Sequence, residues 1–254
     1  HRYSSAASDV YKRQAHGVSS AVEEETKSRN LNFFDATCPL VTKVHMEVRK
    51  HAKASKDIIL VGHEGHPEVE GTMGRHINSD NSSIYLVQNE CDAKNIKINN
   101  PTKLALVTQT TLSVDETKSI IEILKYRFPD IDIPKKDDIC YATQNRQDAV
   151  KQLALESDFM IVVGSKNSSN SNRLSELAEK CGCRSILIDE FTDIDLDDLK
   201  NYSKISITAG ASAPESKVME IAKSLEQHTD AEIIEHGEDN DCLLYTSPSP
   251  RDIS

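Results

Sequence analysis

The sequence predicts an α/β protein built from repeated units with mostly parallel sheets. Short apolar runs rich in Val, Ile and Leu alternate with longer amphipathic patterns, the order expected of strands joined by crossover helices. The same arrangement of residues then occurs twice along the chain. Trp is absent and aromatic residues make up only 5% of the chain, so Ile, Leu, Val and Ala must fill the core, as in sheets covered on both faces.

The individual elements follow from these patterns in chain order. Strands are expected where short runs rich in apolar residues stand between polar segments, at NFF (32–34), DIILV (57–61), SIYLV (83–87), KLALV (103–107), FMIVV (159–163), RSILI (184–188) and KISI (204–207). Helices are expected where apolar residues recur every three or four positions, at 42–55, 114–128, 146–157, 173–181 and 215–227. In such sheets, ligands bind at the carboxyl ends of the strands.

The repeat is led by a cysteine. Cys38 and Cys140 each stand before a helix and then a strand that ends in glycine, at Gly62 and Gly164, and both intervals are 24 residues. A Thr/Ser-rich loop then follows a later strand in each copy, at 106–117 and 206–216. We therefore expect two copies of one cysteine-led α/β unit.

The repeat also divides the chain. Residues 35–136 and 137–230 are expected to be the second and third units, and 15–34 the closing loop and helix of a first unit whose own cysteine would lie upstream of residue 1. Residues 1–14 and the end of 231–254 resemble translated adapter sequence, so they are set aside together with Cys242. The rest of 231–254 is expected to be part of a C-terminal tail.

Composition excludes several classes of partner. The net charge of −11 argues against binding to nucleic acid or to an anionic membrane, because both depend on clustered Lys and Arg. No apolar stretch is long enough to span a membrane and no signal peptide begins the chain, so a cytoplasmic protein is expected. Six cysteines are too few and too irregular for a disulfide scaffold.

One donor-rich segment suits a phosphate. GSKNSSNSNR (164–173) comes directly after an apolar run and directly before a helical pattern. Hydroxyls, amides and the positive end of a helix dipole would meet there and favour an anion. The alternative is a flexible Ser/Asn linker, although linkers rarely stand between a buried strand and an amphipathic helix.

The two repeated cysteines have two interpretations. A helix N-terminus favours the thiolate, the form that binds metal or attacks an electrophile, whereas most isolated cysteines simply pack in the core. Equivalent positions around a common axis favour an iron–sulfur cluster held by three such thiolates. The Cys181-Gly-Cys183 pair is expected to pack at a helix end, and Cys91 is expected to pack beside a polar loop.

GHEGHPEVEGT (62–72) places two histidines and a carboxylate after a strand. Gly65 and Pro67 exclude the helix that a zinc-protease pattern needs, so we expect a loop in which His66 faces an anion and Glu68 handles a proton. An ordinary polar loop remains the alternative. Five loops of this kind should lie on one edge of the sheets, around a shared polar cavity.

In this order, AHGVS, DATCPLVTKVH, GHEGHPEVEGTMG, TQTTLSVDET, DDICYAT, GSKNSSNSNRL and TAGASAP resemble the 4-hydroxy-3-methylbut-2-enyl diphosphate reductase family, from about Ala15 to Gly237. The resemblance implies three α/β units in a pseudo-threefold arrangement around a central 4Fe-4S cluster. Site residues are implied as follows: Cys38 and Cys140 as cluster ligands; His16, His66, Ser168, Ser169, Asn170 and Ser212 at the diphosphate; Glu68 and Thr110 at the substrate hydroxyl.

The resemblance also implies a reaction. Reductive removal of the substrate hydroxyl would give isopentenyl and dimethylallyl diphosphate, with electrons from a ferredoxin or flavodoxin. The family's N-terminal motif is absent here, so we expect this chain alone to assemble little intact cluster. Two other functions stay open. The first is a non-redox enzyme with a cysteine nucleophile and His66 as base, and the second is a module that only binds a phosphorylated metabolite.

Overall fold

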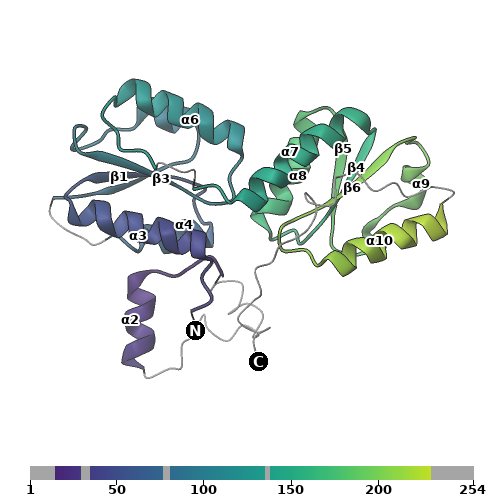
Figure 1. Ribbon diagram of the computed structural model, residues 1–254, viewed down its shortest axis with the longest axis horizontal. Helices are drawn as coiled ribbons and strands as arrows, with labels where there is room; N and C mark the ends of the chain where they lie inside the picture. The colour runs from purple at the N-terminus through teal and green to yellow at the C-terminus, as the bar shows by residue number, and fades with distance from the viewer. Residues whose placement is uncertain (1–14, 30–34, 77–80, 135–137, 230–254) are drawn as a thin grey trace. The chain divides into compact units, whose positions relative to one another are not determined.

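The computed structural model describes residues 15–29, 35–76, 81–134 and 138–229. The chain forms two compact units, His1–Gln144 and Asn145–Ser254 (Figure 1). Each unit contains one three-stranded sheet in which every pairing is parallel. The predicted α/β class with parallel sheets is therefore confirmed.

The first unit has the strand order β2-β1-β3. Its strands are β1 (Asp57–Val61), β2 (Ile84–Val87) and β3 (Leu104–Thr108), and its helices are α2 (Ser20–Ser28), α3 (Pro39–Lys53), α4 (Pro67–Met73), α5 (Glu90–Asn95) and α6 (Val114–Arg127). In Figure 1, α3 and α4 cover one face of the sheet and α6 covers the other. Helix α7 (Tyr141–Glu156) begins in this unit and continues into the second.

Alternation along β1 explains the two layers. Ile58 and Leu60 pack with α3 and α4, whereas Ile59 and Val61 pack with α6. All five residues of β1 are buried, which is why the four residues after Asp57 are all apolar and do not alternate with polar ones. Each buried aliphatic side chain contributes about 1.5–3 kcal/mol relative to exposure.

The second unit repeats this topology with the order β5-β4-β6. Its strands are β4 (Phe159–Val163), β5 (Arg184–Ile188) and β6 (Ile205–Ala209), followed or separated by α8 (Ser169–Lys180), the 3-10 helix η1 (Phe191–Asp193), α9 (Leu196–Leu199) and α10 (Glu215–His228). Met160 and Val162 pack with α7 and α8 on one face, and Ile161 and Val163 pack with α10 on the other.

The glycine that ends each central strand has the same role in both units. The Gly62 N–H donates to the Val87 carbonyl (3.0 Å) and the Gly164 N–H donates to the Ile188 carbonyl (2.8 Å). A Cβ on Gly62 would lie 2.6 Å from Val69 Cγ2, so the next helix can approach only a residue without a side chain. The repeated strand order and these matching contacts agree with the repeat seen in the sequence.

Three details differ from expectation. Residues 67–73 form helix α4 and not a loop, because Pro67 occupies the first helical position, where its missing N–H costs nothing. Helix α8 begins at Ser169, so half of the predicted 164–173 loop is helical. Cys91 is exposed on α5, so the expectation that it packs is wrong.

Other expectations for single elements have different outcomes. Cys183 is buried after the end of α8, and burial raises the pKa of its thiol. The NFF run (32–34) lies outside the described residues. No described helix combines the length and the apolar character needed to cross a membrane.

Candidate functional site

His66 is the N-cap of α4 and lies beside a second histidine. Its Nδ1 accepts a hydrogen bond from the Glu68 backbone N–H (3.2 Å). In the neutral ring the proton is therefore on Nε2, which leaves Nε2–H as a donor. The ring centroid of His16 lies 5.2 Å from that of His66. Two imidazoles and the N-terminus of a helix thus converge at the carboxyl end of β1.

Both histidines are held in the neutral form. Burial lowers the pKa of His66 to about 4, with smaller contributions from His16 and His63, and burial also lowers the pKa of His16. A bound anion would oppose this shift, because a nearby negative charge favours the imidazolium. The pair is therefore suited to binding an anion that brings its own charge into the site.

Glu68 of α4 is buried, and its carboxyl group accepts two hydrogen bonds from Thr110 in the loop after β3. It is 2% exposed. The Thr110 backbone N–H donates to Oε1 (2.7 Å) and the Thr110 hydroxyl donates to Oε2 (3.0 Å). Burial raises the pKa of Glu68 to about 7, although the two hydrogen bonds from Thr110 act in the opposite direction. Glu68 can therefore hold or release a proton near neutral pH, as an acid–base group must.

The two predicted ligand cysteines stand at the starts of helices. Cys38 is the N-cap of α3, and its backbone N–H donates to the Ala15 carbonyl (3.1 Å). Cys140 directly precedes α7, and its backbone N–H donates to the Thr110 carbonyl (2.9 Å). Both are free and partly exposed. Backbone contacts therefore join both cysteines to the loops of His16 and Thr110.

The two thiols could supply only part of the donor set of a metal cluster. Among the described residues, no three His, Cys, Asp or Glu side chains gather as a metal site would require. An iron–sulfur cluster with three protein ligands therefore needs a donor beyond those described here. The residues present do not by themselves fit the whole group.

The second unit carries a different cap at the equivalent place. Ser168 is the N-cap of α8, and its Oγ accepts from the Ser171 N–H (3.3 Å). Asn170 is 5% exposed, and neither its Oδ1 nor its Nδ2 has a hydrogen-bond partner within the described part of the chain. Buried amides are rarely left unpaired, so Asn170 indicates a site for a polar ligand. Ser169 is the first helical residue, beside this cap.

Ser212 lies on an exposed turn after β6. The preceding residues are tightly packed, since a Cβ on Gly210 would lie 2.0 Å from Ser171 Oγ and one on Gly164 would lie 2.3 Å from it. The Ala213 N–H donates to the Gly210 carbonyl (2.9 Å), which fixes the turn. Ser212 therefore lies on a turn that is held by the close packing of Gly210 and by this hydrogen bond.

Equivalent positions of the two units hold the candidate residues. Cys38 and Cys140, His66 and Ser168, and Glu68 and Asn170 are each 102 residues apart. Both members of the second pair are N-caps and both members of the third are buried. His16, His66, Glu68, Thr110 and both cysteines are connected within the first unit, whereas Ser168, Ser169, Asn170 and Ser212 belong to the second. That the loops of the two units face one another stays a prediction.

Two features near the site were not predicted from the sequence. Gln109 is buried, and its side chain accepts from the His63 N–H (3.1 Å) and donates to Thr111 Oγ1 (3.0 Å). Asp138 is buried and pairs with Lys43 (3.0 Å), 95 residues away. Gln109 lies within the TQTT loop, so the sequence could have marked it as a candidate site residue. Nothing in the sequence pairs Lys43 with Asp138.

The fold defines an α/β protein with two copies of a three-stranded parallel sheet. Its site combines cysteines that stand at helix starts, a pair of histidines and a carboxyl group suited to acid–base chemistry. The family model described as LytB protein matches residues 5–226. The chain belongs to the LytB family.

Known relatives agree with this assignment. The chain is 58% identical over 211 residues to 4-hydroxy-3-methylbut-2-enyl diphosphate reductase of Saccharophagus degradans, covering 83% of this chain and 68% of that protein. It is 53% identical over 234 residues to the enzyme of the same name from Marinobacter nauticus, covering 92% and 74%. The solved E-1-hydroxy-2-methyl-but-2-enyl-4-diphosphate reductase of Plasmodium falciparum matches with a TM-score of 0.78 and 39% identity, over 83% of this chain and 65% of that one.

Proposed function

We propose that this chain carries out the reaction named in its relatives, the reductive dehydroxylation of 4-hydroxy-3-methylbut-2-enyl diphosphate. Two electrons and two protons enter, the C–O bond of the substrate hydroxyl breaks, and the oxygen leaves as water. One proton completes that water. The other, with the two electrons, forms a C–H bond at one end of the allyl group, which gives isopentenyl or dimethylallyl diphosphate.

The observation that carries this proposal is the Glu68–Thr110 pair. A hydroxyl is a poor leaving group until it is protonated, and a carboxyl with a pKa of about 7 can supply that proton at physiological pH. Thr110 holds both oxygens of the carboxyl group, which fixes its orientation. In this role Glu68 donates the proton, and the Thr110 hydroxyl orients the substrate oxygen.

The diphosphate is assigned to the helix caps. His66 would donate from Nε2, and His16 beside it would gain positive charge as the anion enters. In the second unit Ser168, Ser169 and Asn170 offer hydroxyl, amide and backbone donors at the N-terminus of α8, where an anion is favoured, and Ser212 adds a hydroxyl. The two unpaired polar atoms of Asn170 would be satisfied by the ligand.

Cys38 and Cys140 are proposed as two ligands of a 4Fe-4S cluster, with a third cysteine ligand expected upstream of residue 1. When bound, such a cluster supplies the electrons and a Lewis acid for the hydroxyl. A ferredoxin or flavodoxin is the proposed electron donor, and a pseudo-threefold arrangement of the units around the cluster is the proposed assembly.

Anaerobic reduction of the substrate tests this function. The chain is loaded with iron and sulfide and supplied with dithionite, and product is expressed per mole of bound cluster so that incomplete loading does not hide activity. We expect little cluster to assemble on this chain, the loaded fraction to form isopentenyl and dimethylallyl diphosphate, and Cys38→Ser and Cys140→Ser to lose the bound iron. Cys91→Ser, which changes an exposed thiol away from these helix caps, is the matched control.

Three results would overturn the proposal. They are no binding of the diphosphate, substrate binding without product at a loaded cluster, and iron binding that both cysteine changes leave intact. Alkylation of Cys140 that stops turnover of a phosphorylated substrate without loss of iron would instead support a non-redox enzyme.

A further inference from the structure

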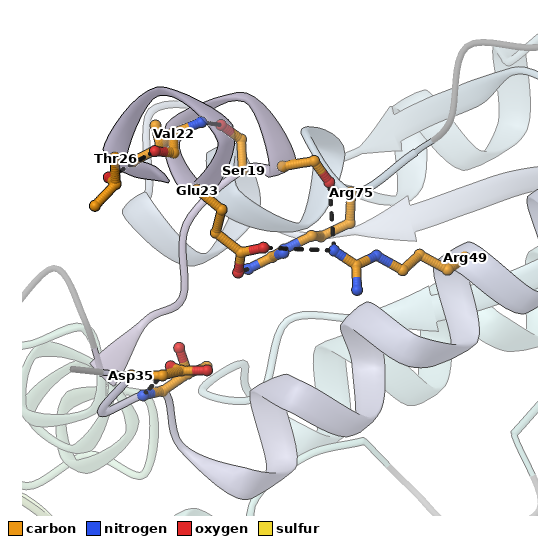
Figure 2. Close-up of polar contacts among 9 residues, drawn as sticks. Ser19, Val22, Glu23, Thr26, Asp35, Arg49 and Arg75 are labelled. Atoms are coloured by element: carbon orange, nitrogen blue, oxygen red, sulfur yellow. Dashed lines mark hydrogen bonds and ion pairs between the residues drawn. The ribbon is translucent and has the colours of Figure 1, made fainter. Parts of the chain in front are cut away.

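The segment that carries His16 is held against α3 and α4 by an ion pair between buried Arg75 and partly buried Glu23. Arg75, just after α4, is 4% exposed, and its guanidinium lies 2.5 Å from Glu23 of α2. Arg49 of α3 approaches the other oxygen of Glu23 at 3.8 Å and donates to Ser20 Oγ (3.4 Å). Figure 2 shows Arg49 of α3 and Arg75 of the turn after α4 reaching the same carboxylate. Glu23 is therefore the point at which α2 is tied to α3 and α4.

The chain just before α2 is fitted closely to the same two helices. A Cβ on Gly74 would lie 2.2 Å from Ser19 Cβ, and a Cβ on Gly71 would lie 2.9 Å from the Gly17 carbonyl oxygen. The Ser20 N–H donates to the Gly74 carbonyl (3.0 Å). The glycines on and after α4 thus let residues 17–20 lie directly against that helix.

His45 of α3 closes the other side of the segment. Its ring is 4% exposed, and a Cβ on Gly17 would lie 2.3 Å from its Cε1. Gly17 has φ of +74°, a conformation that favours glycine. Burial, reinforced by Arg75 and Arg49, lowers the pKa of His45 to about 4, so the ring is a neutral wedge. His16 directly precedes Gly17, so this packing holds the backbone from which the His16 ring reaches His66.

We propose that Glu23, Arg75 and His45 are positioning residues that hold His16 against His66 and thereby set the affinity of this site for a diphosphate. The inference rests on the proposed role of the two histidines. A charged hydrogen bond from a well-placed histidine to a phosphate contributes about tenfold or more to affinity. Glu23→Gln leaves the Arg75 charge buried without its partner, which weakens the contact between α2 and α4. Part of the affinity that His16 contributes should then be lost.

A double-mutant cycle with inorganic pyrophosphate tests the coupling. Calorimetry gives the dissociation constant, and thermal melting gives stability, for wild type, Glu23→Gln, His16→Ala and the double variant. We expect Glu23→Gln to raise the dissociation constant about three- to tenfold in the wild-type background and to leave it unchanged when His16 is already Ala. The melting temperature should fall in both backgrounds, because the Glu23–Arg75 ion pair is broken in both.

Glu25→Gln is the matched control, because Glu25 lies on the same helix and pairs only with the exposed Arg29 among the described contacts. It should change neither quantity. An equal loss of affinity from Glu23→Gln in both backgrounds would mean a merely structural role and would overturn the inference. So would an unchanged affinity after Glu23→Gln when His16→Ala weakens binding. If His16→Ala has no effect, the proposed role of His16 fails as well, which separates the two failures.

A second pair of variants tests the wedge. Gly17→Ala drives a methyl group into the His45 ring and should weaken pyrophosphate binding about tenfold, while Gly17→Ala combined with His45→Ala should recover part of that loss. The recovery will be incomplete because alanine is strained at a positive φ. No recovery would show that His45 does not position the loop.

Discussion

Asn170→Leu should make the unliganded protein more stable while destroying the anion site. The side chain is 5% exposed and its two polar atoms have no partner within the described residues. Each unmade buried hydrogen bond costs about 1–3 kcal/mol, and water that enters the site offsets part of this cost. Leucine has a similar shape and no polar atoms, so the free energy of unfolding should rise by about 1–2 kcal/mol.

The matched control is two residues away on the same helix. The Nδ2 of Asn172 donates to the carbonyls of Lys166 and Ser168, both at 2.8 Å. Asn172→Leu removes two satisfied hydrogen bonds, although the Ser168 carbonyl keeps the Asn172 backbone N–H (3.1 Å), so it should lower the free energy of unfolding by about 1 kcal/mol. The two substitutions are chemically identical and should have opposite effects.

Urea denaturation measures both changes, and calorimetry with pyrophosphate measures the site. We expect Asn170→Leu to raise the midpoint of unfolding and to weaken pyrophosphate binding at least tenfold. A fall in stability as large as that of Asn172→Leu would refute the reasoning, because it would show that the Asn170 amide is satisfied in the folded protein.

Three further predictions concern the acid–base pair and the strand-end glycine. The raised pKa of Glu68 costs stability as pH rises from about 4.5 to about 7. The stability of Glu68→Gln relative to wild type should therefore increase by roughly 2.5 kcal/mol between pH 5 and pH 8 in urea denaturation, and parallel pH curves for the two proteins would contradict this. Thr110→Val should slow turnover about 100-fold, whereas Thr110→Ser retains the hydroxyl and most of the rate; equal rates in the two variants would exclude the hydroxyl. Gly164→Ala should lower the free energy of unfolding by about 1–3 kcal/mol because its methyl would overlap Ser171. An unchanged melting temperature would show that Ser171 can move aside without cost.

The central elements of the fold were predictable because their signal is local. Runs such as DIILV and FMIVV read as buried strands, and both are fully buried at the centres of their sheets. Helix starts were harder. Pro67 and the Ser/Asn residues at 168–171 resemble loop residues, yet they occupy N-cap and first-turn positions where Pro, Ser and Asn are favoured.

The site was predictable only in part for a similar reason. Cysteines placed before helices can be recognised from spacing alone, although α3 and α7 begin directly after Cys38 and Cys140 and not at 42 and 146 as expected. The Glu68–Thr110 bonds join residues 42 positions apart, and the ion pair of Glu23 and Arg75 joins residues 52 apart. Periodicity carries no information on such pairs. Only the family resemblance named Glu68 and Thr110 together, and nothing in the sequence indicated Glu23.

The proton on Glu68 is the central requirement of the proposed reaction. Carbon-13 NMR of the labelled glutamate carboxyl groups, with Glu68→Gln to assign the signal, follows its ionisation directly. A midpoint near pH 7 is predicted from the burial of this side chain. A midpoint near the ordinary value of about 4.5 would leave Glu68 ionised at neutral pH and would contradict its role as the proton donor.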